Sequence, residues 1–211
     1  MICLFANQSH LLFHAAYAQA QRGGQVKVVQ AGEPESVCET ADLVISFLSR
    51  RIMKGAALDR PNINLHPGSP EYRSAAGASI AMFEKSPTYG ATSHQMVRAI
   101  DAGPIYAVER FPIGAEDTCA IVTSNSHHAC LNLLRDFMDH WTTHGTVPPF
   151  VNERWSDRYM TRKEFDQWLI LDPNNLEELR EKVRCARHPT YAGPYVRIGG
   201  ILFELAKSER P

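Results

Sequence analysis

The segment Leu43–Leu48 reads LVISFL and carries no charge. A short run this apolar is typical of a strand buried on both faces, as strands of parallel sheets are. Similar runs precede it at Met1–Phe5 and Gln25–Val29, and another follows at Ile63–Leu65. These runs predict an α/β fold with an open, twisted, mostly parallel sheet.

Helical segments and turns separate the apolar runs. Ser9–Arg22 has helical composition and stops at Gly23–Gly24, and a helical turn is expected around Ile52–Leu58. Ala75–Glu84 is a further expected helix, closed by the turn residues of Lys85–Gly90. In sheets built this way, ligands bind beyond the carboxyl ends of the strands, so we expect the functional site at that edge.

The middle of the chain changes pattern. Ala91–Val97 and Ile105–Ile113 alternate between apolar and polar residues, which predicts antiparallel strands added to the sheet. A long helix is expected over Glu116–Trp141. Gly145–Asp157 contains two adjacent prolines and has no clear period, so we expect a boundary there.

Beyond that boundary, the pattern predicts a small extension. Thr161–Trp168 and Asn174–Ala186 are expected helices, and Pro194–Leu205 is an expected hairpin that turns at Gly199–Gly200. About sixty residues rarely form a strong core of their own. We therefore predict a catalytic domain over 1–145 and an extension over 146–211, with helices and a hairpin, that packs on it.

Composition narrows the class of protein. The chain has 211 residues, 44% of them hydrophobic, and a net charge of -1, so it lacks the basic excess that nucleic-acid binding usually needs. Its five cysteines form no C-x-x-C pair, which favours a reducing cytoplasm over a disulfide framework or a zinc site. No run of about eighteen apolar residues and no basic leader segment occurs, so we expect no membrane insertion.

Polar side chains follow the expected strand at Ile63–Leu65. Asn64 and His66 are one residue apart, so on a strand both side chains point to one face and can act on one small group. The turn Pro67–Pro70 (PGSP) follows and lets a ligand approach the backbone closely. A polar strand end with satisfied hydrogen bonds is the other interpretation of the same pattern.

A second group of polar residues lies downstream. His94 falls on an expected strand, and Asp101 lies in the turn before Gly103–Pro104, where an Asp is also a common turn former. The other histidines of the expected helices have no carboxylate at matching spacing, and we interpret them as surface or core residues: His10, His14, His127 and His128.

Four separated blocks in roughly residues 40 to 115 share the order and spacing of a known family: Asp42–Leu48 (DLVISFL), Asn62–Ser74 (NINLHPGSPEYRS), Tyr89–Met96 (YGATSHQM) and Ile100–Ile105 (IDAGPI). They resemble the formyltransferases that use 10-formyltetrahydrofolate, which include methionyl-tRNA formyltransferase and the sugar N-formyltransferases. The resemblance implies a Rossmann-like formyltransferase fold, 10-formyltetrahydrofolate as the cosubstrate and no metal.

The resemblance also implies roles for single residues. The catalytic Asn, His and Asp of the family fall on Asn64, His66 and Asp101, and a supporting histidine falls on His94. An amide can donate to the oxyanion that forms during formyl transfer, and an imidazole can donate to it or accept the proton of the amine.

The same resemblance places the folate pocket after Leu48. Arg51, Ile52 and Met53 are the candidates to line the pterin edge, although Ile52 and Met53 are equally well interpreted as the start of a core helix.

The branch of the family follows from the turn after His66. His66–Tyr72 reads HPGSPEY and looks like the His-Pro-Gly-Pro-Pro-Glu-Tyr variant, found in a group that includes formyltransferases acting on nucleotide-linked amino sugars for lipopolysaccharide and its O-antigen. The acceptor is then expected near Tyr72, which can stack on a ring, and Arg73, which can pair with a phosphate. A homodimer is compatible with the sequence.

Other functions stay open at this point. A formyltetrahydrofolate hydrolase would use the same three residues, and another amine acceptor or a binding module without catalysis would keep the same fold. A tRNA acceptor is disfavoured by the lack of basic excess and of room for a full second domain. Glycinamide ribonucleotide is disfavoured because Ala6–Ser9 has no glycine to approach its phosphate.

Overall fold

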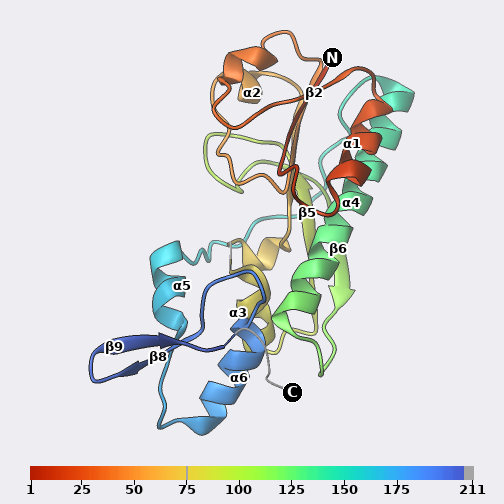
Figure 1. Cartoon of the computed structure of the whole chain (residues 1–211). Coiled ribbons are helices and arrows are strands. Elements are labelled where there is room, and N and C mark those ends of the chain that lie inside the picture. The colour runs from red at the N-terminus through yellow and green to blue at the C-terminus, as the bar shows by residue number, and fades with distance from the viewer. Residues whose placement is uncertain (75, 207–211) are drawn as a thin grey trace.

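Two sheets organise the residues that the computed structural model describes, 1–74 and 76–206. The first has six strands in the order β2-β1-β3-β4-β5-β6, and the second has three strands in the order β7-β8-β9 (Figure 1). The large sheet is mostly parallel and is covered by helices, so the fold class predicted from the apolar runs is confirmed.

The parallel part of the large sheet consists of β1 (Ile2–Ala6), β2 (Val26–Val28), β3 (Leu43–Phe47) and β4 (Asn62–His66). Because β1, β3 and β4 run in the same direction, their carboxyl ends meet at one edge of the sheet. In this register Ser46 lies opposite Asn64.

The remaining two strands of this sheet are antiparallel. They are β5 (Thr88–His94), which pairs with β4, and β6 (Ile105–Pro112), which pairs with β5. The register between β5 and β6 shifts between Ser93 and His94, so the ladder is irregular beside Asn64, the partner of His94 on β4.

The two faces of the sheet bury different side chains. Ile2, Leu4 and Ile45 pack against the helices α1 (Phe13–Gln21) and α4 (Cys119–His144), which lie side by side (Figure 1). The alternate residues of the same strands face the other way and pack with the short helices η1 (Glu35–Cys38) and α2 (Ala56–Asp59): Cys3, Phe5 and Val44. Burial of each large apolar side chain stabilises the fold by about 1.5–3 kcal/mol.

Local signals set the ends of α4. The Thr118 side chain accepts a hydrogen bond from the backbone N–H of Ile121, and Gly145 closes the helix with a φ of +68°. Leu134 and Phe137 on its buried face anchor it to the sheet. The structure therefore confirms the long helix, with an end three residues beyond the predicted Trp141.

The rest of the described chain includes the helix α3 (Gly77–Phe83). It contains η2 (Pro70–Tyr72), α5 (Arg162–Trp168), β7 (Ile170–Leu171), α6 (Leu176–Ala186), β8 (Tyr195–Ile198) and β9 (Ile201–Glu204). Both helices and the hairpin predicted after residue 160 are confirmed, whereas the two-residue strand β7 was not predicted.

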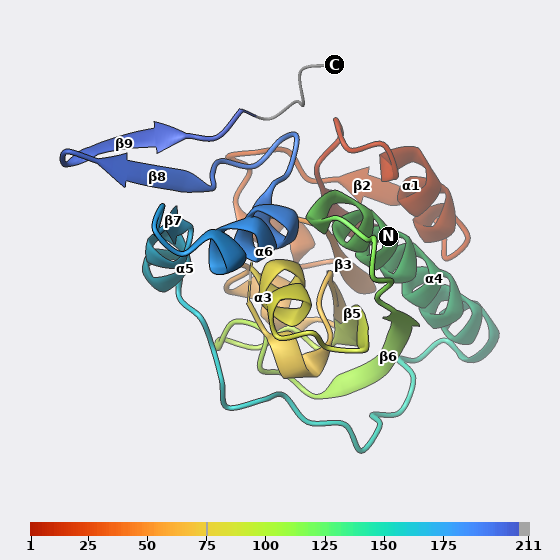
Figure 2. The same ribbon diagram turned by 90° about the horizontal axis from the view of Figure 1, so that it is seen from below.

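The C-terminal residues pack on the first part of the chain. Helix α6 lies beside α3, and the β8–β9 hairpin extends away from both (Figure 2). The ring of Trp168 meets that of Phe83 with centroids 5.3 Å apart, and Arg184 Nη1 donates to the Asp117 carbonyl at 3.0 Å. The division into 1–145 and 146–211 stays a prediction.

Boundaries of α1 and β5 also differ from the sequence patterns. Helix α1 begins at Phe13 and not at Ser9, because the Asn7 side chain accepts from the Ser9 N–H and holds the chain in a turn. Strand β5 begins at Thr88, within the segment predicted as a turn, and buries Tyr89 almost completely. It ends at His94 and not at Val97.

No helix within the described residues is long and apolar enough to cross a membrane.

Candidate active site

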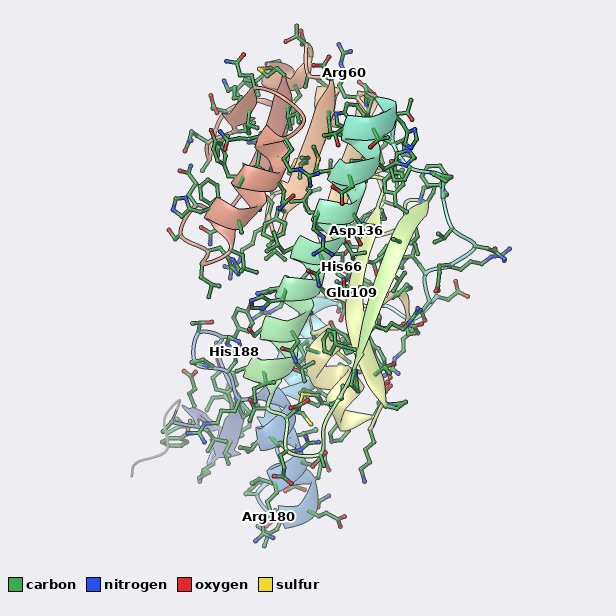
Figure 3. The ribbon with its side chains drawn as sticks, turned by 90° about the vertical axis from the view of Figure 1, so that its right-hand side faces the viewer. Arg60, His66, Glu109, Asp136, Arg180 and His188 are labelled. Carbon is green, nitrogen blue, oxygen red and sulfur yellow. The ribbon has the colours of Figure 1, made fainter. Side chains whose placement is uncertain are left out.

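A cleft of about 760 Å³ lies beyond the carboxyl ends of β1, β3 and β4. All four residues expected to carry chemistry line it: Asn64, His66, His94 and Asp101. They come from β4, from β5 and from the turn between β5 and β6, so the sheet brings together residues that are up to 37 positions apart. Figure 3 shows His66 at the level of the middle of α4.

Asn64 and His94 face each other across the β4–β5 ladder. The Nδ1 atom of His94 lies 2.8 Å from the Gln95 carbonyl, to which only an N–H can donate. In the neutral ring this leaves Nε2 as an acceptor, and Asn64 Nδ2 donates to it at 3.0 Å. His94 therefore fixes which way the Asn64 amide points.

Asp101 completes the cluster from the following turn. Its Oδ1 atom lies 3.5 Å from Asn64 Nδ2 and 3.5 Å from His94 Nε2, and its Oδ2 atom lies 3.4 Å from His66 Nδ1. The residue has a φ of +45°, a conformation that Asp tolerates better than most residues. The turn thus aims the carboxylate at both histidines.

Burial and mutual charge set the protonation states. Burial lowers the pKa of His66, and this effect exceeds the opposing attraction of Asp101. Burial alone would raise the pKa of Asp101, but His66, His94 and Arg73 together lower it below its ordinary value. Near neutral pH, the cluster therefore holds an ionised Asp101 and a neutral His66.

Gly68 leaves room for the His66 ring. A Cβ atom at this position would lie 2.6 Å from His66 Nε2, closer than two such atoms approach. The same Nε2 atom is buried and has no hydrogen-bond partner within the described residues. If His66 Nδ1 donates to Asp101, then Nε2 carries a lone pair that a ligand can satisfy.

Trp155 supports the cluster and was missed by sequence reasoning. Its ring stands edge-on to His66 and His94, with centroids 5.7 Å and 5.0 Å away, and its Nε1 donates to the Gly103 carbonyl at 2.8 Å. Trp155 thus holds the turn that carries Asp101. Trp155 lies in Gly145–Asp157, the segment that has no hydrophobic periodicity and that we predicted to be a boundary. No sequence pattern therefore indicated a functional role for it.

The residues predicted to line the folate pocket lie along the cleft. Ile52 is 55% exposed and Met53 is buried among the residues of the η1 and α2 side. Arg51 donates to Glu35 at 3.2 Å and to the Glu33 carbonyl, and its buried Nη1 has no hydrogen-bond partner among the residues that the structure describes. An apolar wall beside an unpaired N–H fits the flat, polar-edged ring of a pterin.

The residues predicted to bind the acceptor, Tyr72 and Arg73, lie outside the lining of the cleft. Tyr72 packs near Tyr89, and neither it nor Arg73 is among the residues that line the cleft. Arg73 Nη1 lies 3.5 Å from the Asp101 carbonyl, and the Arg73 guanidinium lies 5.5 Å from the centre of the Tyr159 ring. These contacts support the Asp101 turn, and an acceptor role for Tyr72 and Arg73 stays a prediction.

Other residues enclose the cleft. His10 and His127, interpreted from sequence as surface or core residues, meet in its wall. The C-terminal part adds Tyr159, Phe165, Thr190 and Tyr191. Within residues 1–74 and 76–206, no group of three or more His, Cys, Asp or Glu side chains is arranged to hold a metal.

No protein-family model matches the chain. Among curated proteins, it is 26% identical over 176 residues to a methionyl-tRNA formyltransferase of Lactobacillus johnsonii, covering 77% of this chain and 51% of the relative. It is 37% identical over 82 residues to that of Sorangium cellulosum, covering 37% of this chain and 26% of the relative. The chain spans about half or less of the length of these relatives.

Solved structures of sugar N-formyltransferases have the same fold. That from Shewanella sp FDAARGOS_354 superposes with a TM-score of 0.77 at 18% identity, covering 100% of this chain and 97% of that one. An N-formyltransferase of Helicobacter canadensis, in complex with folinic acid and dTDP-3-aminofucose, superposes with a TM-score of 0.70 at 16% identity, covering 94% and 84%. The resemblance predicted from the four motif blocks is thus confirmed, and the chain has the formyltransferase fold.

Proposed function

We propose that this chain, with its formyltransferase fold, moves a formyl group from 10-formyltetrahydrofolate to the amine of a nucleotide-linked amino sugar. The observation that carries the proposal is the meeting of Asn64, His66 and Asp101 in one cleft wall, each within 3.5 Å of another member of the cluster. An amide donor, an imidazole and a carboxylate are the groups that formyl transfer needs.

Asn64 is suited to stabilise negative charge. When an amine attacks the formyl carbon, the carbonyl oxygen becomes an oxyanion, and a fixed N–H donor lowers the energy of that state. The hydrogen bond to His94 Nε2 fixes the Asn64 amide, and the second Nδ2 hydrogen makes only a long contact of 3.5 Å with Asp101. That second hydrogen is available for the oxyanion.

His66 and Asp101 are suited to move the proton. The attacking amine must lose a proton, and the nitrogen released from the folate must gain one. A neutral His66 accepts the first proton at Nε2, while Asp101 beside Nδ1 stabilises the imidazolium that results. His66 then returns the proton to the leaving nitrogen, so the group ends in its starting state.

The folate is expected on the Arg51 side of the cleft, with Ile52 and Met53 against the pterin. Two observations support this location: the Arg51 Nη1 atom has no hydrogen-bond partner in the described part of the chain, and the Ile52 side chain is exposed. Binding of folinic acid by the related Helicobacter canadensis enzyme is consistent with a folate cosubstrate.

An amino sugar on a nucleotide is the acceptor that we favour. The solved structures that this chain matches over most of their length include sugar N-formyltransferases and a methionyl-tRNA formyltransferase, and one N-formyltransferase is in complex with dTDP-3-aminofucose. A tRNA acceptor is less favoured, because the chain carries a net charge of -1 and so lacks the basic excess that nucleic-acid binding usually needs. A lipopolysaccharide product, a cytoplasmic location and a homodimer stay predictions.

A formyltetrahydrofolate hydrolase remains a second candidate, because His66 and Asp101 can also accept a proton from an attacking water molecule. The two activities differ in whether tetrahydrofolate release requires an acceptor.

The test is to incubate the protein with 10-formyltetrahydrofolate and a panel of nucleotide-linked amino sugars while recording tetrahydrofolate release. We expect release to depend on one sugar and to yield a formylated product. Formate from folate alone, without stimulation by any sugar, would instead establish the hydrolase.

A variant separates an enzyme from a binding module. His66→Asn should abolish turnover and keep folate binding, and His128→Asn, a change at an exposed position of α4, serves as the matched control. A wild-type protein that binds folate and shows no turnover with or without acceptors would contradict both enzyme hypotheses.

A further inference from the structure

Two histidines outside the catalytic cluster form a pair in the wall of the same cleft. His10 follows β1 and His127 lies on α4, so the pair joins segments 117 positions apart. His10 Nε2 lies 3.2 Å from His127 Nδ1, and the rings meet edge-on with centroids 4.9 Å apart. A hydrogen bond therefore ties the two imidazoles together.

The contacts of His10 fix the direction of this hydrogen bond. The backbone N–H of Leu12 donates to His10 Nδ1 at 3.2 Å, so neutral His10 carries its proton on Nε2. That proton is donated to His127 Nδ1, and neutral His127 must then carry its own proton on Nε2. Within the described residues this Nε2–H has no protein acceptor, so the chain of hydrogen bonds ends in an available donor.

The surroundings of His127 favour a negatively charged ligand. The titratable groups that face it are imidazoles: His10 after β1, His128 on its own helix and His188 from the C-terminal segment, which Figure 3 labels beside α4. Burial and these neighbours lower the pKa of His127 to about 4. An anion at Nε2 would meet a donor and would raise that pKa again.

The location of the pair separates it from the folate side. Met53 lies on the face of the sheet covered by η1 and α2, whereas Ala129 of α4 belongs to the opposite face. The cleft runs past the carboxyl edge of the sheet, and residues from both faces line it. Asn64 and His66, which lie at that edge, line it as well. A formyl donor bound on one side of the sheet and a formyl acceptor bound on the other would therefore meet at the cluster of Asn64, His66 and Asp101.

We propose that the Nε2–H of His127, oriented by His10, binds a phosphate oxygen of a nucleoside diphosphate, the part of the acceptor that does not react. The inference rests on the proposed function, because it assigns one end of the cleft to the acceptor. Thr190 and Tyr191 line the cleft near this pair and add a hydroxyl group and an aromatic ring. The folate, whose carboxylates are also anionic, is the other source of negative charge to be distinguished.

The test measures binding without turnover. Thymidine, uridine, guanosine and cytidine diphosphates are titrated into the wild-type protein by calorimetry, and folinic acid is titrated separately. In His127→Ala, we expect the affinity for the nucleotide that binds to fall about tenfold or more, because a hydrogen bond to a charged group is lost. The affinity for folinic acid should stay unchanged.

Matched variants show that the N–H itself is responsible. His127→Gln places an amide N–H near the position of Nε2 and should retain most of the affinity, whereas His127→Asn should not, because its shorter side chain reaches only as far as Nδ1. His14→Ala removes an exposed histidine of α1 that does not line the cleft and should leave the affinity unchanged.

Other outcomes would overturn the inference. These are unchanged nucleotide affinity in His127→Ala, an equal loss of folinic acid affinity, or failure of all four nucleotides to bind the wild-type protein. If Arg73→Ala lowers the nucleotide affinity and His127→Ala does not, the phosphate binds at Arg73 and not at His127. If His127 controls nucleotide binding and no sugar is formylated, the inference holds and the proposed function fails. If a sugar is formylated with the same KM in His127→Ala, the inference alone fails.

Discussion

The two sheets of this protein bury their residues to very different extents. All five residues of β3 are buried, and the neighbouring β4 carries Asn64 and His66 at its end. All four residues of β9 in the small sheet are exposed, including Phe203 at 51%. A catalytic side chain needs a fixed backbone beneath it, so the large sheet is suited to position the proposed catalytic residues, whereas the C-terminal part contributes walls to the cleft.

Removal of the Asn64 side chain on β4 tests this difference between the two sheets most directly. Asn64→Ala should lower kcat by about 10²–10³-fold, the effect of losing one oxyanion donor, and should destabilise the fold by about 1–3 kcal/mol, because the buried His94 Nε2 loses its hydrogen-bond donor. Steady-state kinetics and calorimetric unfolding measure the two effects. A fall in kcat of less than about tenfold would show that Asn64 is not that donor.

The second change tests the space beside His66. Gly68→Ala places a Cβ atom 2.6 Å from His66 Nε2 and 3.2 Å from the Tyr89 hydroxyl, so the His66 ring must shift from its position beside Asp101. We expect a loss of kcat of about 10²-fold, since misplacement by about 1 Å costs that much. Ser69→Ala is the control in the same turn, and equal effects of the two changes would argue against the contact with His66.

The third prediction concerns pH. Because burial lowers the pKa of His66, kcat/KM should stay level as the pH falls to about 6.5 and then decline about tenfold per unit at a lower pH, where His66 takes up a proton. Asp101 opposes this shift, so Asp101→Asn should lower the pKa of His66 further. Histidine NMR titration measures both values, and a higher pKa in Asp101→Asn would contradict the assignment.

The fourth change loosens the turn that carries Asp101. Trp155→Phe keeps an aromatic ring near His94 and removes the N–H that bonds the Gly103 carbonyl. We expect kcat to fall about fivefold to tenfold, which corresponds to about 1 kcal/mol for one hydrogen bond. The pKa of His66 should shift as Asp101 moves, whereas a role in packing alone would leave the pKa in place and change only the unfolding temperature.

The smallest effect on turnover is expected in the C-terminal part. Trp168→Ala removes ring contacts with Phe83 and Phe165 and should lower the free energy of unfolding by about 2 kcal/mol, with kcat nearly unchanged. Chemical denaturation measures the stability, and Trp168→Phe should restore part of it. A loss of kcat as large as that of Asn64→Ala would erase the distinction between the two sheets.

Much of the fold was predictable because its signals are local. Runs such as Leu43–Leu48 are apolar over their whole length, and the spacing of Asn64 and His66 places them on one face without any knowledge of other segments. The cluster with His94 and Asp101 followed from motif order, and the structure brings all four together.

The parts that were missed depend on contacts between distant segments. Trp155 reaches His94 from a stretch with no periodic pattern, and His10 meets His127 only because α4 folds back along the sheet. The boundary of β5 was missed because Thr88–Gly90 looks like a turn, whereas burial of Tyr89 makes it the start of a strand. Local propensity does not contain such information.

The positive φ angles of Leu48 and Asp101 have a consequence for protein engineering. Both residues line the cleft, and backbone strain of this kind costs about 1 kcal/mol or more in a residue other than glycine. Replacement of Asp101 by glycine would relieve that strain and remove the carboxylate at once. A library selected for heat resistance alone would therefore tend to enrich inactive variants at this turn, so selection should be coupled to formyl transfer from the first round.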